Sequence, residues 1–76
     1  MNDKTAREMF EEQGYMMVTK KGTHYLHQEY GISIIFYEES KRFAITDSTS
    51  AGDTVTVDME IYHAITQQMK ELGWLK

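Results

Sequence analysis

Two glycine–aromatic pairs, one near each end of the chain, constrain the fold more than any other feature of this sequence. Gly14-Tyr15 and Gly73-Trp74 each follow a stretch in which apolar residues recur at three- and four-residue steps, as along one side of a helix. A glycine in the left-handed conformation often ends a helix, and the apolar residue after it packs back onto the last turns. We therefore expect one helix near each end of the chain.

The first helix is predicted over about residues 4–13. Thr5 and Glu8 have the spacing of a capping box, and Asp3 is an alternative cap. We expect the aromatic ring of Tyr15 to pack against a side chain five positions earlier in this helix. The side chains on its apolar side are Ala6, Met9, Phe10 and Gln13.

The last helix is predicted to begin after Asp58, which is a good N-cap residue, and to end at Gly73. Trp74 follows the terminal glycine, and we expect it to pack onto Met69. The apolar stripe of this helix is Ile61, Tyr62, Ile65, Met69 and Leu72.

Between the helices, residues alternate or cluster as they do in β-strands. The predicted strands are residues 15–20, 24–29, 32–37, 42–46 and 54–57, separated by short turns and by one polar loop. Short links favour antiparallel neighbours, so the strands should form a meander. The predicted fold class is α+β: a four- to five-stranded antiparallel meander flanked by an N-terminal and a C-terminal helix.

Length and composition limit the possible functions. The 76 residues should form one domain (residues 1–76), and the absence of cysteine excludes a disulfide or a thiolate metal site. The net charge of −4 disfavours direct binding to nucleic acid. No segment approaches the ~20 apolar residues of a membrane span, and no export segment is recognisable. We therefore expect a cytoplasmic protein that binds neither nucleic acid nor membrane.

The segment Tyr30-Gly31-Ile32-Ser33-Ile34-Ile35-Phe36-Tyr37, the Lys-Arg turn after it and the closing Glu71-Leu72-Gly73-Trp74 carry a resemblance. They are similar to segments of a loose group of small uncharacterised proteins of phages, prophages and genomes of low-GC Gram-positive bacteria. That group has no assigned activity, so the resemblance implies an accessory role on a mobile element and no catalytic residues.

The histidines suggest two possible sites. His24 and His27 have an H-x-x-H spacing, with Glu29 close by. In a strand, residues three apart point to opposite faces, so metal chelation would need a bulge or a turn. His63 in the last helix could do acid–base chemistry with a neighbouring carboxylate, but no serine or cysteine nucleophile is tied to it by sequence. We predict no catalytic residue, no metal ligand and no cofactor.

The loop Asp47-Ser48-Thr49-Ser50-Ala51-Gly52-Asp53 contains the small hydroxyl residues of a phosphate or calcium site. A phosphate loop would need a helix N-terminus or a lysine after it, whereas a strand is predicted here. The spacing and the terminal glutamate of an EF-hand are also missing. We therefore interpret the loop as a connection, with contact to a partner as the alternative.

The third predicted strand is apolar on both faces. One of its rows should join the core together with side chains of the later strands: Ile32, Ile34, Phe36, Phe43, Ile45, Val55 and Val57. Ile35 and Tyr37 are then left on the far face, flanked by Tyr25 or Leu26 and by Met17 or Val18, according to register. We predict Ile35, Tyr37 and Tyr25 as partner-facing residues, with a second copy of the chain as the favoured partner, so that Ile35→Asp should disrupt this association. The alternative is that one helix crosses over and covers this row.

Three functions remain. The first is a non-enzymatic protein-binding or adaptor protein that forms a homodimer, with another protein as a further partner. The second is an acidic inhibitor that masks the nucleic-acid-binding surface of another protein. The third, which the sequence favours least, is a small metal-binding or enzymatic domain.

Overall fold

The computed structural model describes residues 4–19, 23–47 and 56–75, which form two helices and four strands. This architecture confirms the α+β prediction. In chain order the elements are α1 (Ala6–Glu12), β1 (Met16–Met17), β2 (His24–His27), β3 (Ile32–Tyr37), β4 (Arg42–Asp47) and α2 (Met59–Glu71).

The four strands form one antiparallel sheet in the order β1-β2-β3-β4, which is the predicted meander. The β3 bounds agree with the prediction, whereas β1 is shorter than expected. Of the predicted fifth strand, residues 54 and 55 lie outside the described residues, and residues 56 and 57 are not in a strand.

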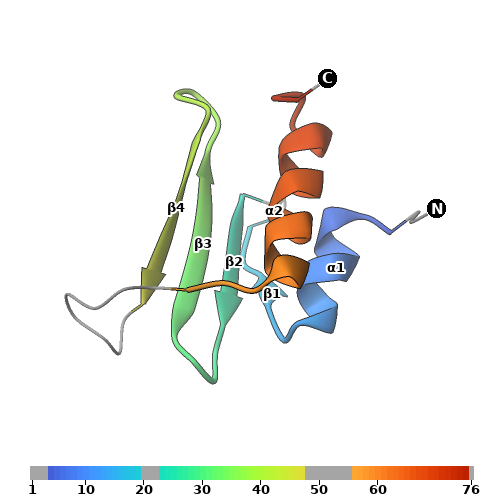
Figure 1. Ribbon diagram of the computed structural model, residues 1–76. Coiled ribbons are helices and arrows are strands. Elements are labelled where there is room, and N and C mark those ends of the chain that lie inside the picture. The colour runs from blue at the N-terminus through green and yellow to red at the C-terminus, as the bar shows by residue number, and fades with distance from the viewer. Residues whose placement is uncertain (1–3, 20–22, 48–55, 76) are drawn as a thin grey trace.

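Both helices lie on the same side of the sheet, next to β1 and β2, and β4 is the strand farthest from them (Figure 1). The helices contact each other and run antiparallel, since Ala6 at the start of α1 lies next to Glu71 at the end of α2. Their buried side chains pack with those of the inner sheet face. The core consists of Ala6, Phe10, Tyr15, Tyr25, Ile34, Phe36, Ile61, Ala64 and Ile65.

Both helix endings have the hydrogen bonds of a Schellman motif. The amide of Tyr15 donates to the carbonyl of Phe10 at 3.0 Å, and the amide of Trp74 donates to that of Met69 at 2.9 Å. Gly14 and Gly73 both have positive φ, at 88° and 80°. The rings of Phe10 and Tyr15 meet edge to face with their centroids 5.8 Å apart. The glycine–aromatic pairs are therefore Schellman endings, as expected.

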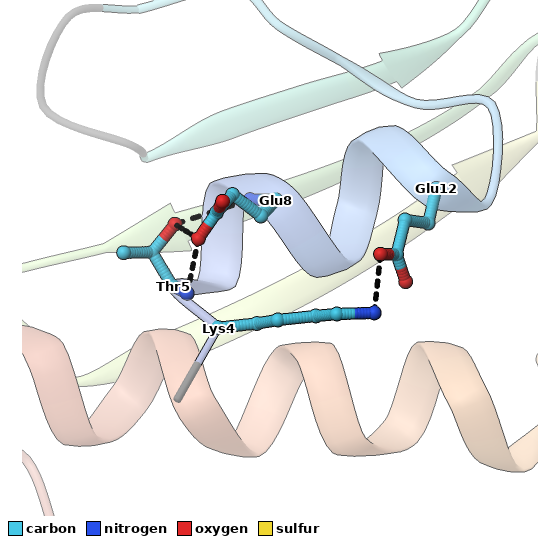
Figure 2. Close-up of polar contacts among 4 residues, drawn as sticks. All are labelled: Lys4, Thr5, Glu8 and Glu12. Atoms are coloured by element: carbon cyan, nitrogen blue, oxygen red, sulfur yellow. Dashed lines mark hydrogen bonds and ion pairs between the residues drawn. The ribbon is translucent and has the colours of Figure 1, made fainter. Parts of the chain in front are cut away.

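The start of α1 carries the predicted capping box (Figure 2). The amide of Glu8 donates to the Thr5 hydroxyl at 3.2 Å, and the amide of Thr5 donates to the Glu8 carboxylate at 2.9 Å. Hydrogen bonds from Thr5, first from its backbone and then from its side chain, lower the pKa of Glu8. Lys4 and Glu12 form an ion pair along the same helix (Figure 2).

One buried polar contact joins the sheet to α2. The Tyr25 hydroxyl donates to the Gln68 side-chain oxygen at 2.7 Å, and the Tyr25 ring stacks on that of Phe10 at 4.0 Å. Burial, followed by the negative charge of Glu71, raises the pKa of Tyr25 to about 12. The sequence placed Tyr62 on the apolar stripe of α2, but its side chain is 55% exposed, and Gln68 is buried instead.

Candidate protein-binding surface

The face of the sheet opposite the helices carries a group of apolar side chains that we call the outer patch: Met16, Leu26, Ile35 and Tyr37. The register of the strands determines which side chains belong to the outer patch. Met16 lies opposite Leu26, and the buried neighbours Ile34 and Phe36 alternate with Ile35 and Tyr37 along β3. Because successive strand residues point to opposite faces, burial of the one row places the other on the outer face.

Members of the outer patch remain in contact with solvent. Tyr37 is 48% exposed, and Met16 is 49% exposed. Ile35 and Leu26, on the two central strands, are half-buried between their neighbours. Half-solvated antiparallel sheets normally carry polar residues on the outer face, which makes this row unusual. The predicted alternative, in which a helix covers the row, is wrong for the described helices, because α1 and α2 both pack on the inner face.

His24 adds a polar atom to the same face. It lies opposite Ile35 in the β2–β3 pairing. Its Nε2 atom is buried and has no hydrogen-bond partner among the described residues. Buried polar atoms are normally paired, so this nitrogen is an exception in the β2–β3 part of the sheet.

The prediction that Tyr25 faces a partner is wrong. Its side chain is only 1% exposed, lies on the inner face opposite Ile34, and is hydrogen-bonded to Gln68. The sequence did not determine the strand register, and the register observed puts Leu26, rather than Tyr25, in the outer patch. The same register brings Met16 to the outer face and packs Met17 against the core.

β4 forms an edge of the sheet. Within the part of the chain that the structure describes, it pairs with β3 alone. Phe43 points to the helix side and contacts the Phe36 ring, with a centroid separation of 6.0 Å, yet it is 42% exposed. The prediction that Phe43 belongs to the core is thus only partly met, because the helices lie over the opposite half of the sheet.

A groove of about 320 Å³ lies where the end of α1 meets the start of α2. Its lining includes Tyr15, His27, Tyr30 and Asp58. These groups already have structural roles. The His27 Nδ1 atom accepts a hydrogen bond from the Tyr30 amide at 3.2 Å, and Asp58 caps α2 through the Ile61 amide at 2.9 Å. Burial, followed by the charge of Asp58, raises the pKa of Tyr15.

The three histidines do not meet. His24 is on the outer face and His27 on the inner face, as strand alternation predicts, while His63 is exposed on α2. Among the described residues, no three potential ligands come together to hold a metal ion. Most of the loop at residues 47–53, and Val55, lie outside the described residues. No described helix is long and apolar enough to cross a membrane.

The two-sided pattern of β3 predicted Ile35 and Tyr37, the sequence left Leu26 and Tyr25 as alternatives beside them, and Met16 was not predicted. Met16 and Leu26 join the outer patch only through register, for which the sequence carries no local signal. The exposure of Phe43 depends on which half of the sheet the helices cover.

Comparison with known proteins finds no matching family model, no matching curated protein and no matching solved structure.

Proposed function

We propose that this domain is a non-enzymatic protein-binding or adaptor protein that acts as a homodimer and receives a protein partner on the outer patch. The observation that carries the proposal is the position of Ile35 and Tyr37 on a sheet face that neither helix covers. The resemblance to small phage-type proteins fits such an accessory role.

Shape and chemistry support a protein as the partner. The outer patch is spread over three adjacent strands rather than sunk in a pocket, which suits another protein surface better than a small molecule. Its members include an aromatic side chain with a polar tip, Tyr37, a residue type enriched at protein interfaces.

The proposal is tested with immobilised wild-type protein and an Ile35→Asp variant, in an extract of cells that carry the gene. A protein retained by the wild type is then purified and titrated against both by calorimetry. A charge placed in the middle of an apolar contact should weaken binding by at least about tenfold, as expected for a central interface residue. Circular dichroism first establishes that the variant is folded.

Tyr62→Asp is the matched control, because it introduces the same charge at an exposed aromatic side chain on α2. It should bind like the wild type. Tyr37→Asp is the second outer-patch variant and serves if Ile35→Asp unfolds. The proposal is wrong if every retained protein binds the folded outer-patch variants and the wild type equally well.

A further inference from the structure

The geometry points to a homodimer in which β4 of one protomer pairs antiparallel with β4 of a second copy, with the two-fold axis passing through Ala44. This inference deepens the proposed function, on whose homodimer it rests, by naming the element that joins the copies. The pairing would turn two four-stranded sheets into one continuous sheet.

β4 has little of the usual protection of an edge strand. Natural edge strands are usually protected by charged side chains, proline, a bulge or a short length. β4 pairs with β3 without interruption over six residues, contains no proline, and carries charged side chains only at its two ends, Arg42 and Asp47. Among the described residues its second side meets no strand, so it can accept one.

The backbone groups of β4 point in the directions that this pairing needs. The amide of Phe36 donates to the carbonyl of Thr23, towards β2. Along a strand of an antiparallel sheet, the backbone N–H and C=O groups of successive residues point alternately to one neighbouring strand and to the other. The backbone groups of Ile35 therefore point to β4, and those of Ala44, which lies opposite, point to β3. The N–H and C=O groups of Phe43 and Ile45 therefore point to the outer edge.

The sequence of β4 is self-complementary about Ala44. An interface about a two-fold axis needs a self-complementary surface, in which residue i meets residue j of the copy and j meets i. With Ala44 on the axis, Phe43 lies opposite the partner's Ile45, and the two outward-pointing residues exchange hydrogen bonds. The smallest side chain of the strand then falls where the two chains come closest.

Charge fixes the direction of pairing. Lys41 and Arg42 stand at one end of β4 and Asp47 at the other. An antiparallel copy brings the basic end of one strand level with the acidic end of the other, at both ends of the pair. A parallel copy would place like charges together, which is unfavourable for directly opposed residues.

The pairing also covers apolar surface that the helices leave open. Phe43, 42% exposed on the helix side, gains the partner's Ile45 as a cross-strand neighbour. Pairs of an aromatic with a β-branched side chain stabilise antiparallel sheets. The outer patches of both protomers then lie on one common face, so that the dimer presents two copies of the partner-binding surface.

The decisive experiment uses the absence of cysteine from the chain. Directly opposite residues that do not exchange hydrogen bonds have Cα atoms about 4.5 Å apart, within the range that a disulfide spans. Ala44→Cys is expected to give a disulfide-linked dimer on oxidation, seen on non-reducing gels and by mass. Thr46→Cys is the control on the same strand and face. Its two copies would lie roughly 13 Å apart, since four residues separate them along the strand.

Light scattering over a wide dilution range gives an independent readout. Phe43→Lys places a charge at the interface and should raise the dimer dissociation constant by at least tenfold. Tyr62→Lys, the same change at an exposed aromatic residue on α2, should leave the dimer intact. Wild-type protein that stays monomeric, equal cross-linking of the two cysteine variants, or an unaffected Phe43→Lys dimer would each overturn the inference.

The two proposals fail separately. Ile35 lies one strand away from the axis, so Ile35→Asp should lose the protein partner and still dimerise. A chain that binds a partner through the outer patch but does not cross-link through Ala44→Cys would leave the binding function in place and disprove edge pairing.

Discussion

The Glu71 carboxylate, in the last turn of α2, accepts a hydrogen bond at 2.8 Å from the backbone amide of Ala6, the first residue of α1. The first four amides of a helix have no partner within the helix, and an acidic group near them is favourable. A second bond, from the Gln67 side chain at 3.0 Å, holds the same carboxylate oxygen. One helix is thus capped by the other across 65 residues of chain.

Glu71→Ala should lower the free energy of unfolding by about 1–2 kcal/mol, because it removes a charged acceptor from a part-buried amide. Amide exchange should show the loss mainly in the first turn of α1. Gln67→Ala is the control, since it removes the second hydrogen bond and keeps the cap. Equal effects of the two variants on α1 exchange would contradict this role of Glu71.

Thr5→Ala should lower the free energy of unfolding by about 1 kcal/mol, which is the usual contribution of an N-cap hydroxyl. Glu12→Gln, which breaks the half-exposed ion pair with Lys4, should cost less, because solvent screens such pairs. Urea denaturation of both variants at low and high salt gives the comparison. A larger effect of Glu12→Gln would show that the ion pair, and not the capping box, stabilises α1.

Gly14→Ala should destabilise the fold more than Gly73→Ala, although both glycines have positive φ. Each substitution places alanine in the left-handed region, which costs about 1–2 kcal/mol. At Gly14 the added Cβ would also lie 2.6 Å from Nε2 of the buried His27 ring, whereas at Gly73 it meets nothing within 4 Å.

We expect the additional cost at Gly14 to be about 1 kcal/mol or more, measured by thermal or urea unfolding. In a His27→Ala background, where the ring is absent, Gly14→Ala should cost about as much as Gly73→Ala. A cost that does not change in this background would assign the whole effect to backbone strain.

Stability should fall at alkaline pH through Tyr25. Burial raises its pKa to about 12 in the folded chain, while an unfolded tyrosine titrates near ~10. The folded state therefore keeps the proton where the unfolded state loses it. The protonated Tyr25 makes its full contribution to the free energy of unfolding below about pH 10. This contribution, up to about 2–3 kcal/mol, is lost as pH rises towards about 12.

Tyr25→Phe separates this titration from that of other groups. At pH 8 it should be less stable than the wild type by about 1–2 kcal/mol, because Gln68 loses its buried partner. The difference should shrink as pH rises above 10, in urea unfolding followed by circular dichroism. A constant difference between the two proteins would show that Tyr25 ionisation does not limit alkaline stability.

Local signals were sufficient to predict the helix ends. The capping box, the Asp58 cap and both glycine–aromatic endings depend on residues within five positions of each other, so a short sequence window contains all the necessary groups. β3 was predictable for a similar reason, since its run of β-branched and aromatic residues has high strand propensity.

Features that depend on distant residues could not be predicted. Burial of Gln68 follows from the hydroxyl of Tyr25, 43 residues away, which needs an acceptor inside the core. Ala6 and Ala64 are both fully buried on the two helices that contact each other. α2 is therefore rotated relative to its predicted stripe, and Tyr62 points to solvent. Membership of the outer patch likewise depended on a register that a shift of one residue would reverse.

The link between Ala6 and Glu71 has a consequence for the order of folding. The seven residues of α1 are too few to hold a stable helix alone, so α1 depends on packing and on its cap. During synthesis, Ala6 leaves the ribosome 65 residues before Glu71. The meander between them has only short connections and can pair earlier. We expect α1 to become protected from amide exchange only when α2 docks, so that α1, although it is made before the sheet, folds after it.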